Sequence, residues 1–434
     1  MEDEPVLKPE KVFKRYDIRG KYPEEIDDEF AKILGKAVGT WSLRNSTGRV
    51  LVTRDTKETS KALKKELIKG VKSAGATVFD AGAGPTDYTA VNSKYQEAVG
   101  VQVTSSHLPV EFNGFKLIYP EGNGFVNEDL YEVQDIFRER DFREQIGSVE
   151  KVEASCRDRY VSNVKEYFKQ FFETIDAKIV YDSMGGAGGL FLPELLEDLG
   201  ADLTDISDVD EIINPPNPKP ENLRHVEDKV KELDADIGLV TDMDADRLAV
   251  YHEGEWLNGN ELFSVFAQII QPEKIVASID TSSIVENSFD GDISYTRVGD
   301  PFVISKSLQV EAELSGEPNG HYSFTGFVPY NSGTLAALLV AASDINSLKG
   351  QIPGFSNITE SFEVDNKRKE LEKLKEEVRE CHEIISEVDG IKFKVGDAIV
   401  LVRSSGSSNK LRIVVDGEHV SSVKDALEQV KELF

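Results

Sequence analysis

Short apolar segments alternate with segments of helical spacing through the first 350 residues of the chain. Each apolar segment ends in a polar or glycine-rich turn, which is typical of a buried strand. The apolar segments lie at 49–53, 99–103, 178–182, 236–240 and 274–279. An alternation of strand, loop and helix predicts α/β layers with mostly parallel strands.

The strand–loop–helix unit recurs near residues 49, 178 and 274, which predicts three similar α/β domains. The C-terminal part differs: a charged helix is expected at 366–388, then strands, then a final helix at 420–434. The pattern therefore predicts a smaller α+β domain here, and the polar stretch 356–363 is expected to be the linker that precedes it. The expected domains are 1–147, 148–255, 256–360 and 361–434. Four domains around a central cleft would bring the strand-end loops together, where α/β sheets bind ligands.

Composition and net charge exclude several classes of protein. Hydrophobic residues make up 39% of the 434 residues, enough for packed cores. The net charge of −29 excludes a generally basic nucleic-acid-binding surface, and the acid excess fits either adaptation to high salt or drift. The two cysteines, Cys156 and Cys381, have no metal-ligand spacing. Without an apolar run of about 20 residues or a signal peptide, we expect a cytoplasmic protein with no membrane partner.

Three carboxylates follow the apolar segment 236–240. Asp242, Asp244 and Asp246 alternate along the chain, so in extended backbone their side chains would converge on one side. Three hard oxygen ligands suit Mg²⁺, and the neighbouring Arg247 could hold a phosphate. A calcium loop is disfavoured because its sixth position is Arg247 and not glycine. A solvated acidic turn is the remaining alternative.

A hydroxyl-rich loop follows the apolar segment 99–103. Thr104, Ser105 and Ser106 are followed by His107, and Lys116 comes after an Asn-Gly turn. A hydroxyl at a strand end with a histidine and a lysine nearby suits a nucleophile or phosphoryl carrier. The alternative is an ordinary Ser/Thr turn.

Two later loops carry polar groups suited to sugar phosphates. In the segment 401–413, Gly406 frees the backbone, Arg403 can bind a phosphate through two hydrogen bonds, and donors come from Ser405, Ser407 and Lys410. In the segment 315–324, Glu317, Asn319 and His321 could hydrogen-bond sugar hydroxyls. A flexible hairpin and a simple turn are the alternatives. The glycines at 185–189 lack the dinucleotide-binding spacing, and the chain has no P-loop motif.

Together these loops resemble the motifs of the α-D-phosphohexomutases, in the same order and over nearly the whole chain. The family's T-A-S-H-N-P and Y-N-G-x-K are similar to 104–109 and 112–116, and its D-G-D-A/G-D-R is similar to 242–247. Its G-E-x-S-G-H is similar to 316–321, its R-P-S-G-T-E-P-K to 403–410 and its Y-D-I-R-G to 16–20. Leu108, Asn319 and Asp300 depart from the family pattern.

The resemblance implies three similar mixed-sheet α/β domains and a smaller C-terminal α+β domain resembling the TATA-binding-protein-like fold, around a central cleft. It implies a phosphoserine at Ser106, whose oxygen completes a Mg²⁺ site with Asp242, Asp244 and Asp246. Lys116, Arg247 and His107 would act at the phosphoryl group. Substrate would be bound by Tyr16, Arg19, Glu317, Asn319, His321, Arg403, Ser405, Gly406 and Ser407.

The implied activity is interconversion of hexose 1-phosphate and hexose 6-phosphate through a 1,6-bisphosphate, which would also serve as activator. The sequence Y-D-I-R-G after Phe13 resembles the phosphomannomutase/phosphoglucomutase group, which favours mannose and glucose phosphates. A phosphoglucosamine mutase, a Mg²⁺-dependent phosphatase and a non-catalytic sugar-phosphate sensor are the alternatives. We expect small sugar phosphates as partners and a monomer or homodimer.

Overall fold

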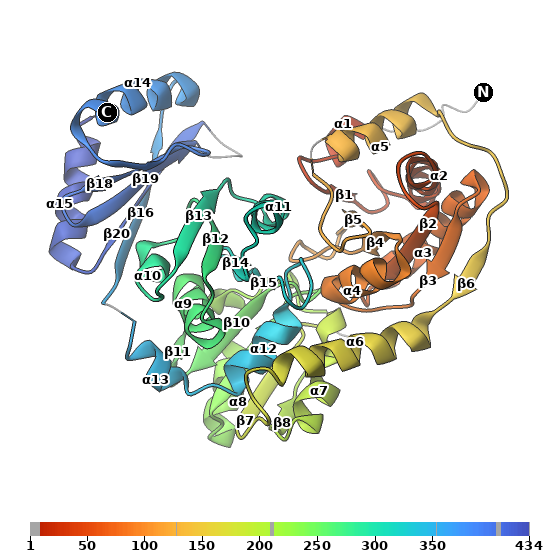
Figure 1. Ribbon diagram of the computed structural model, residues 1–434, viewed down its shortest axis with the longest axis horizontal. Helices are drawn as coiled ribbons and strands as arrows, with labels where there is room; N and C mark the ends of the chain where they lie inside the picture. Colours follow the sequence, from red (N-terminus) through yellow and green to blue (C-terminus); the bar gives the residue numbers. More distant parts are fainter. Residues whose placement is uncertain (1–8, 127, 209–211, 353, 405–408, 434) are drawn as a thin grey trace. The chain divides into compact units, whose positions relative to one another are not determined.

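The structure, a computed structural model, describes residues 9–126, 128–208, 212–352, 354–404 and 409–433 (Figure 1). The chain forms two compact units. The first unit comprises 1–257 and 320–343, and the second comprises 258–319 and 344–434. Both contain the α/β layers that the sequence pattern predicts.

The first sheet of the first unit is mixed, with the strand order β1-β5-β4-β2-β3-β6. β2 pairs in parallel with β3 and β4, whereas β5 is antiparallel to β4 and β1. The strands are β1 (Ile18–Lys21), β2 (Arg49–Arg54), β3 (Thr77–Asp80), β4 (Val99–Val103), β5 (Phe112–Ile118) and β6 (Val149–Lys151). The helices are α1 (Pro9–Val12), α2 (Asp28–Asn45), α3 (Glu58–Ala74), α4 (Thr86–Gln96) and α5 (Glu128–Glu139). The strands predicted at 49–53 and 99–103 are thus confirmed.

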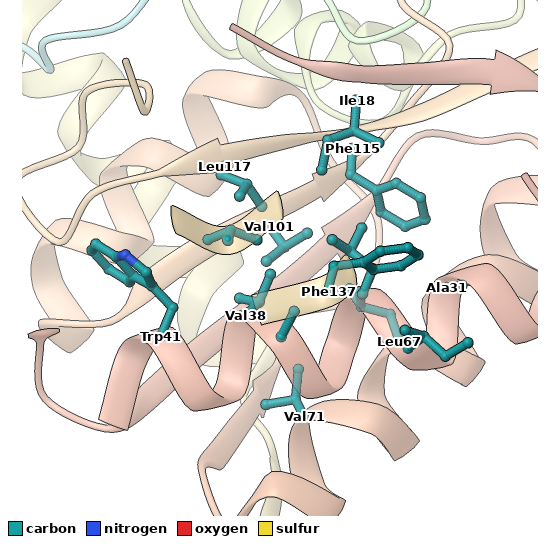
Figure 2. Close-up of a cluster of buried hydrophobic side chains, with 14 of the residues drawn as sticks. Ile18, Ala31, Val38, Trp41, Leu67, Val71, Val101, Phe115, Leu117 and Phe137 are labelled. Carbon is teal, nitrogen blue, oxygen red and sulfur yellow. The ribbon is translucent and has the colours of Figure 1, made fainter. Parts of the chain in front are cut away.

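One apolar core joins this sheet to its helices. Figure 2 shows side chains of β1, β4 and β5 meeting those of α2, α3 and α5, among them Ile18, Val38, Val101, Phe115 and Phe137. The backbones of α2 and α3 approach closely because both helices carry glycine at the contact. A Cβ on Gly70 would lie 2.0 Å from the Lys32 carbonyl oxygen, so the two helices can pack only without it.

The second sheet of this unit has the order β11-β10-β9-β7-β8. β7 pairs in parallel with β8 and β9, and β9 forms an antiparallel hairpin with β10. The strands are β7 (Lys178–Asp182), β8 (Asp202–Asp205), β9 (Ile237–Thr241), β10 (Leu248–His252) and β11 (Glu255–Trp256), and β15 (Tyr322–Phe324) also belongs to the unit. The helices are α6 (Glu153–Phe168), α7 (Leu192–Asp198), α8 (Arg224–Leu233) and α12 (Gly333–Ala341), with 3₁₀ turns at Ala187–Leu190 and Pro220–Asn222.

In the second unit, β12 pairs in parallel with β13 and β14. These strands are β12 (Lys274–Ser278), β13 (Asp292–Thr296) and β14 (Leu314–Gly316), and the helices are α9 (Gly259–Ile270), α10 (Ser283–Glu286), α11 (Asp300–Val310) and α13 (Ile345–Lys349). Asn258 begins α9 with a capping box, since its side chain accepts from the Glu261 N–H while the Glu261 carboxylate accepts from the Asn258 N–H. This is the third α/β layer predicted by the strand at 274–279.

The C-terminal domain has an antiparallel sheet in the order β16-β20-β19-β18-β17. Its strands are β16 (Ser356–Glu363), β17 (Ile384–Ser386), β18 (Ile391–Val395), β19 (Ala398–Ser404) and β20 (Lys410–Gly417). The helices α14 (Lys367–Cys381) and α15 (Val420–Lys431) share one apolar core with the sheet. The predicted α+β domain is therefore confirmed.

Two predictions in this domain were wrong. The segment 356–363 is an edge strand and not a linker, because its polar residues alternate with partly buried ones, and Ile358 and Phe362 pack on the core. The helix predicted to reach 388 ends at Cys381, since β-branched Ile384 pairs with Phe393 of β18. Among the described residues, no helix combines the length and apolar character needed to cross a membrane.

We predict that Gly70→Ala lowers the stability of the first unit, because the added methyl group must push α2 and α3 apart. Overpacking of this kind costs about 1–3 kcal/mol. Urea unfolding followed by circular dichroism measures the loss. Gly354→Ala is the control, since the nearest neighbour of its new Cβ would be the Glu418 carbonyl oxygen at 3.7 Å, an ordinary contact distance. Equal stability of the two variants would contradict the close helix contact.

Candidate active site

The acidic loop connects the two strands of the β9–β10 hairpin. Thr241 pairs with Leu248, so residues 242–247 form the connection. The backbone is a tight turn, because the Ala245 N–H donates to the Asp242 carbonyl oxygen at 3.1 Å and Ala245 has a φ of 50°. The ligand oxygens of the three aspartates lie within 4.8 Å of one another, and all three residues are fully buried. The predicted convergence is present, but a turn and not extended backbone produces it.

The glycine-rich segment after β7 packs directly beneath this loop. The Ala187 N–H donates to the Met243 carbonyl oxygen at 2.8 Å. A Cβ on Gly186 would lie only 2.7 Å from the Asp242 carbonyl oxygen. The glycines at 185–189 therefore serve close backbone packing, which agrees with their lack of a dinucleotide-binding spacing.

Ser106 lies in the loop between β4 and β5, facing the acidic loop. Its hydroxyl donates to Asp242 Oδ2 at 3.3 Å, and its Oγ lies 3.2 Å from His107 Nδ1. The residue is buried and has a φ of 49°, a conformation uncommon for residues other than glycine. The Ser106 N–H donates to Thr104 Oγ1 at 2.8 Å, which helps to hold this backbone.

Three cationic side chains surround the carboxylates and the serine loop. Lys116, on β5, donates to Asp244 Oδ2 at 2.7 Å and also pairs with Asp246. Arg247 Nε lies 3.1 Å from His321 Nε2, which lies 3.2 Å from Asp246 Oδ1. Arg19, on β1, donates to the Ser105 carbonyl oxygen at 3.0 Å. Residues from four distant parts of the sequence thus meet in the first unit.

Burial and mutual charge set the protonation of the cluster. Burial raises the pKa of Asp242, and the charges of Asp246 and Asp244 raise it further. Burial also acts on Asp246, but the charges of Lys116, His321 and Arg247 outweigh it and hold the pKa of that carboxyl well below its usual range. Burial, Arg247 and Arg19 lower the pKa of His107 to about 2, so its ring is neutral at pH 7.

The donor set suits a divalent cation with a preference for hard oxygen ligands. Asp244 Oδ1 is buried and has no hydrogen-bond partner among the described residues, although Oδ2 of the same carboxylate has two. A buried carboxylate oxygen without a partner is costly, and a metal ion would satisfy it. The residues present therefore fit Mg²⁺.

Other predicted site residues lie elsewhere or outside the described chain. Tyr16 is half-buried just before β1. In the second unit, Glu317 accepts from the Gly299 N–H at 2.9 Å, Asn319 is exposed, and Arg403 lies 3.3 Å from Asp280. Ser405, Gly406 and Ser407 lie outside the described residues.

Two further residues, Asp55 and Thr86, support the loops and are not predicted by the sequence pattern. The Ser105 N–H donates to Asp55 Oδ2 at 3.1 Å, and the Thr86 hydroxyl donates to Asp244 Oδ2 at 2.8 Å. Both follow parallel strands of the first sheet, Asp55 directly after β2 and Thr86 after the β3 loop. Their position at the carboxyl ends of parallel strands, where α/β sheets bind ligands, was the one sequence feature that could have marked them as site residues.

Comparison with known proteins identifies the family of this chain. Models of the phosphoglucomutase/phosphomannomutase α/β/α domains I, II and III match residues 10–144, 158–255 and 258–349. A phosphomannomutase of Methanocaldococcus jannaschii is 30% identical, with 98% of this chain and 97% of that protein covered. The chain belongs to the α-D-phosphohexomutase family. It is a phosphomutase, an enzyme of the isomerase class.

Two further relatives show the spread of this phosphohexomutase family. A protein named probable phosphoglucosamine mutase, from Methanococcoides burtonii, is 29% identical, with 94% of this chain and 95% of that protein covered. The crystal structure of a phosphoglucomutase/phosphomannomutase family protein from Burkholderia thailandensis superposes with a TM-score of 0.84 at 22% identity, covering 97% of this chain and 96% of that one. The latter shows the common fold.

We predict that Mg²⁺ raises the melting temperature of this phosphohexomutase, because an ion that binds only the folded state stabilises it by mass action. The gain is about 2.7 kcal/mol at a concentration one hundred times the dissociation constant. Asp244→Asn should lose most of this shift, while Asp228→Asn, on the exposed face of α8, should keep it. Thermal unfolding with MgCl₂ and with EDTA measures both. An undiminished shift in Asp244→Asn would place the ion elsewhere.

Proposed function

We propose that the chain interconverts the 1- and 6-phosphates of mannose and glucose through a phosphoserine at Ser106 and a hexose 1,6-bisphosphate. The observation that carries this proposal is the hydrogen bond of the Ser106 hydroxyl to Asp242, at the edge of the three carboxylates. A phosphate on this oxygen would lie beside the ion that the carboxylates hold. Membership in the phosphohexomutase family supports the same assignment.

The proposed chemistry consists of two phosphoryl transfers. In the first, the bond between phosphorus and Ser106 Oγ breaks, and a bond to the 6-hydroxyl oxygen of hexose 1-phosphate forms. The sugar hydroxyl loses its proton, and Ser106 Oγ regains one. The bisphosphate then turns, and in the second transfer the bond between phosphorus and the sugar 1-oxygen breaks while a bond to Ser106 Oγ forms. Ser106 Oγ loses its proton, the 1-oxygen gains one, and hexose 6-phosphate leaves. The same site thus serves both positions of the sugar.

The surrounding side chains supply charge and position. Lys116 and Arg247 offset the negative charge of the transferring phosphoryl group, and bound Mg²⁺ would polarise its oxygens. The neutral ring of His107 lies next to the serine oxygen and can orient it through a hydrogen bond. A phosphate dianion bound beside the ring would raise its low pKa and so allow it to take up or return the proton. Because these groups are held by hydrogen bonds before substrate arrives, little reorganisation is needed during transfer.

Substrate contacts are assigned by the resemblance of the loops. Arg19 and Tyr16 would face the sugar phosphate in the first unit. Glu317, Asn319 and His321 would bind sugar hydroxyls. The loop from Arg403 through Ser405, Gly406 and Ser407 would bind the phosphate that is not reacting. In support, the Arg403 guanidinium already binds anionic groups: it lies 3.3 Å from the Asp280 carboxylate and 3.9 Å from the Asp389 carboxylate. A phosphate, which is also an anion, could take the place of these carboxylates.

We predict that Ser106→Ala abolishes turnover without unfolding the protein, because the phosphoryl carrier is lost. Intact-mass measurement should find a phosphate on the wild type and none on the variant. Ser105→Ala is the matched control, since the Ser105 hydroxyl is buried with no partner among the described residues. It should keep both the phosphate and the activity.

Three results would contradict the proposed function. Full activity of Ser106→Ala would move the phosphate to Ser105 or Thr104. Release of inorganic phosphate without isomerisation would identify a phosphatase. Binding of sugar phosphate to a wild type that never becomes phosphorylated or turns over would identify a sensor.

The sugar preference is a separate prediction. We expect higher kcat/KM for mannose 1-phosphate and glucose 1-phosphate than for glucosamine 1-phosphate. The basis is the segment Y-D-I-R-G at 16–20, which resembles that of the phosphomannomutase/phosphoglucomutase group. A panel of the three substrates, with a trace of hexose 1,6-bisphosphate, measures the order. The name of the Methanococcoides relative favours the alternative, and a preference for glucosamine 1-phosphate would establish it for this chain.

A further inference from the structure

The N-terminus of α4 makes two hydrogen bonds to the acidic loop. The Thr86 hydroxyl donates to Asp244 Oδ2 at 2.8 Å, and the Thr86 N–H donates to the Asp244 carbonyl oxygen at 2.9 Å. Thr86 is fully buried, as is Asp244. One residue therefore fixes both the backbone and the side chain of Asp244.

These contacts make the two oxygens of Asp244 unequal. Oδ2 accepts hydrogen bonds from both Thr86 and Lys116. Oδ1 is buried away from solvent and has no hydrogen-bond partner among the described residues. With two donors arranged around Oδ2, rotation of the carboxylate would break at least one strong hydrogen bond. Oδ1 is thereby kept available in the cluster with Asp242 and Asp246.

We propose that Thr86 is a positioning residue that holds the Asp244 carboxylate with Oδ1 directed to the metal ion. The inference rests on the Mg²⁺ site of the proposed function and adds the group that orients one of its ligands. Without the Thr86 hydroxyl, Lys116 is the remaining donor in contact with Oδ2. A lysine ammonium is a compact charge on a flexible stem, so it can pair with either oxygen and does not select one.

The neighbouring Asp87 holds Thr86 in place. Its Oδ2 accepts from the Tyr160 hydroxyl of α6 at 2.8 Å and from the Ser332 hydroxyl at 2.5 Å, and its Oδ1 accepts from the Tyr88 N–H at 2.8 Å. Ser332 caps α12, where its oxygen also accepts from the Leu335 N–H. A single buried carboxylate therefore ties α4 to α6 and to the start of α12.

The start of α12 also contacts the acidic loop. The Gly333 N–H donates to the Ala245 carbonyl oxygen at 2.9 Å, and a Cβ on Gly333 would lie 2.7 Å from the same oxygen. The loop is thus held at Asp244 by α4 and at Ala245 by α12, and the hydrogen bond between Asp87 and Ser332 joins the two supports. This arrangement explains how Thr86 can hold a ligand without being one.

The test measures metal binding directly, with Mn²⁺ as the probe and electron paramagnetic resonance of free Mn²⁺ as the readout. Loss of a side chain that orients a metal ligand weakens affinity by about 10- to 100-fold. We expect Thr86→Val, which keeps the shape but not the hydroxyl, to bind Mn²⁺ about tenfold more weakly than the wild type. Thr86→Ser, which keeps the hydroxyl, should restore most of the affinity.

Thr89→Val is the matched control on the same helix. The Thr89 hydroxyl is also buried, but it hydrogen-bonds Gln102 and Thr53 and not the acidic loop. Thr89→Val should therefore bind Mn²⁺ with wild-type affinity. If it weakens binding as much as Thr86→Val does, general loosening of α4 explains the loss and the proposal is wrong.

A second variant keeps the proposal testable if Thr86→Val does not fold. Burial raises the pKa of Asp87 to about 7, so a neutral amide of the same shape is a mild replacement. Asp87→Asn should weaken Mn²⁺ binding severalfold by loosening Thr86. Wild-type affinity in both Thr86→Val and Asp87→Asn would overturn the proposal. No Mn²⁺ binding by the wild type would overturn the metal site as well, whereas the phosphate on Ser106 tests the carrier independently.

Discussion

The structure depends on the burial of three carboxylates beside one lysine. Asp242, Asp244 and Asp246 are fully excluded from water, and their oxygens lie within 4.8 Å of one another. Buried charges are costly unless they are paired and hydrogen-bonded. Lys116 pairs with Asp244 and Asp246. Burial, with the charges of Asp246 and Asp244, nevertheless raises the pKa of Asp242. A divalent ion bound here would add positive charge and would satisfy Asp244 Oδ1, which has no partner among the described residues.

Strained and tightly packed backbone holds this cluster. Ser106 and Ala245, on facing loops, both have positive φ values, and such strain persists only where surrounding contacts determine it. Gly186 and Gly333 allow other segments to press against the acidic loop at distances that exclude a side chain. The loops are thereby fixed before any phosphate arrives, which is the condition for electrostatic stabilisation of a transferring group.

The residues that contact the Ser106 loop and the acidic loop all belong to the first unit of this phosphohexomutase. Ser106, the carboxylates, Lys116 and Arg247 are joined by contacts within the first unit, including His321 from a distant part of the chain. Glu317 and Arg403 belong to the second unit. The groups proposed for phosphoryl transfer therefore lie in one unit, whereas two of the residues proposed to bind the sugar phosphate lie in the other.

The sequence by itself determined the layers and the chemistry. Short apolar segments predicted β2, β4, β7, β9 and β12, because strands buried on both faces are rich in apolar residues along most of their length. The residue types of the two loops, with the family resemblance, indicated a phosphate and a metal. Local pattern could not determine β16, because a polar edge strand is defined by its pairing with β20. Nor could it determine Thr86, Asp87 or the pairing of Ser106 with Asp242. Those contacts join residues more than 100 positions apart, and only the packing of separate helices and hairpins decides which of many buried hydroxyls meets a carboxylate.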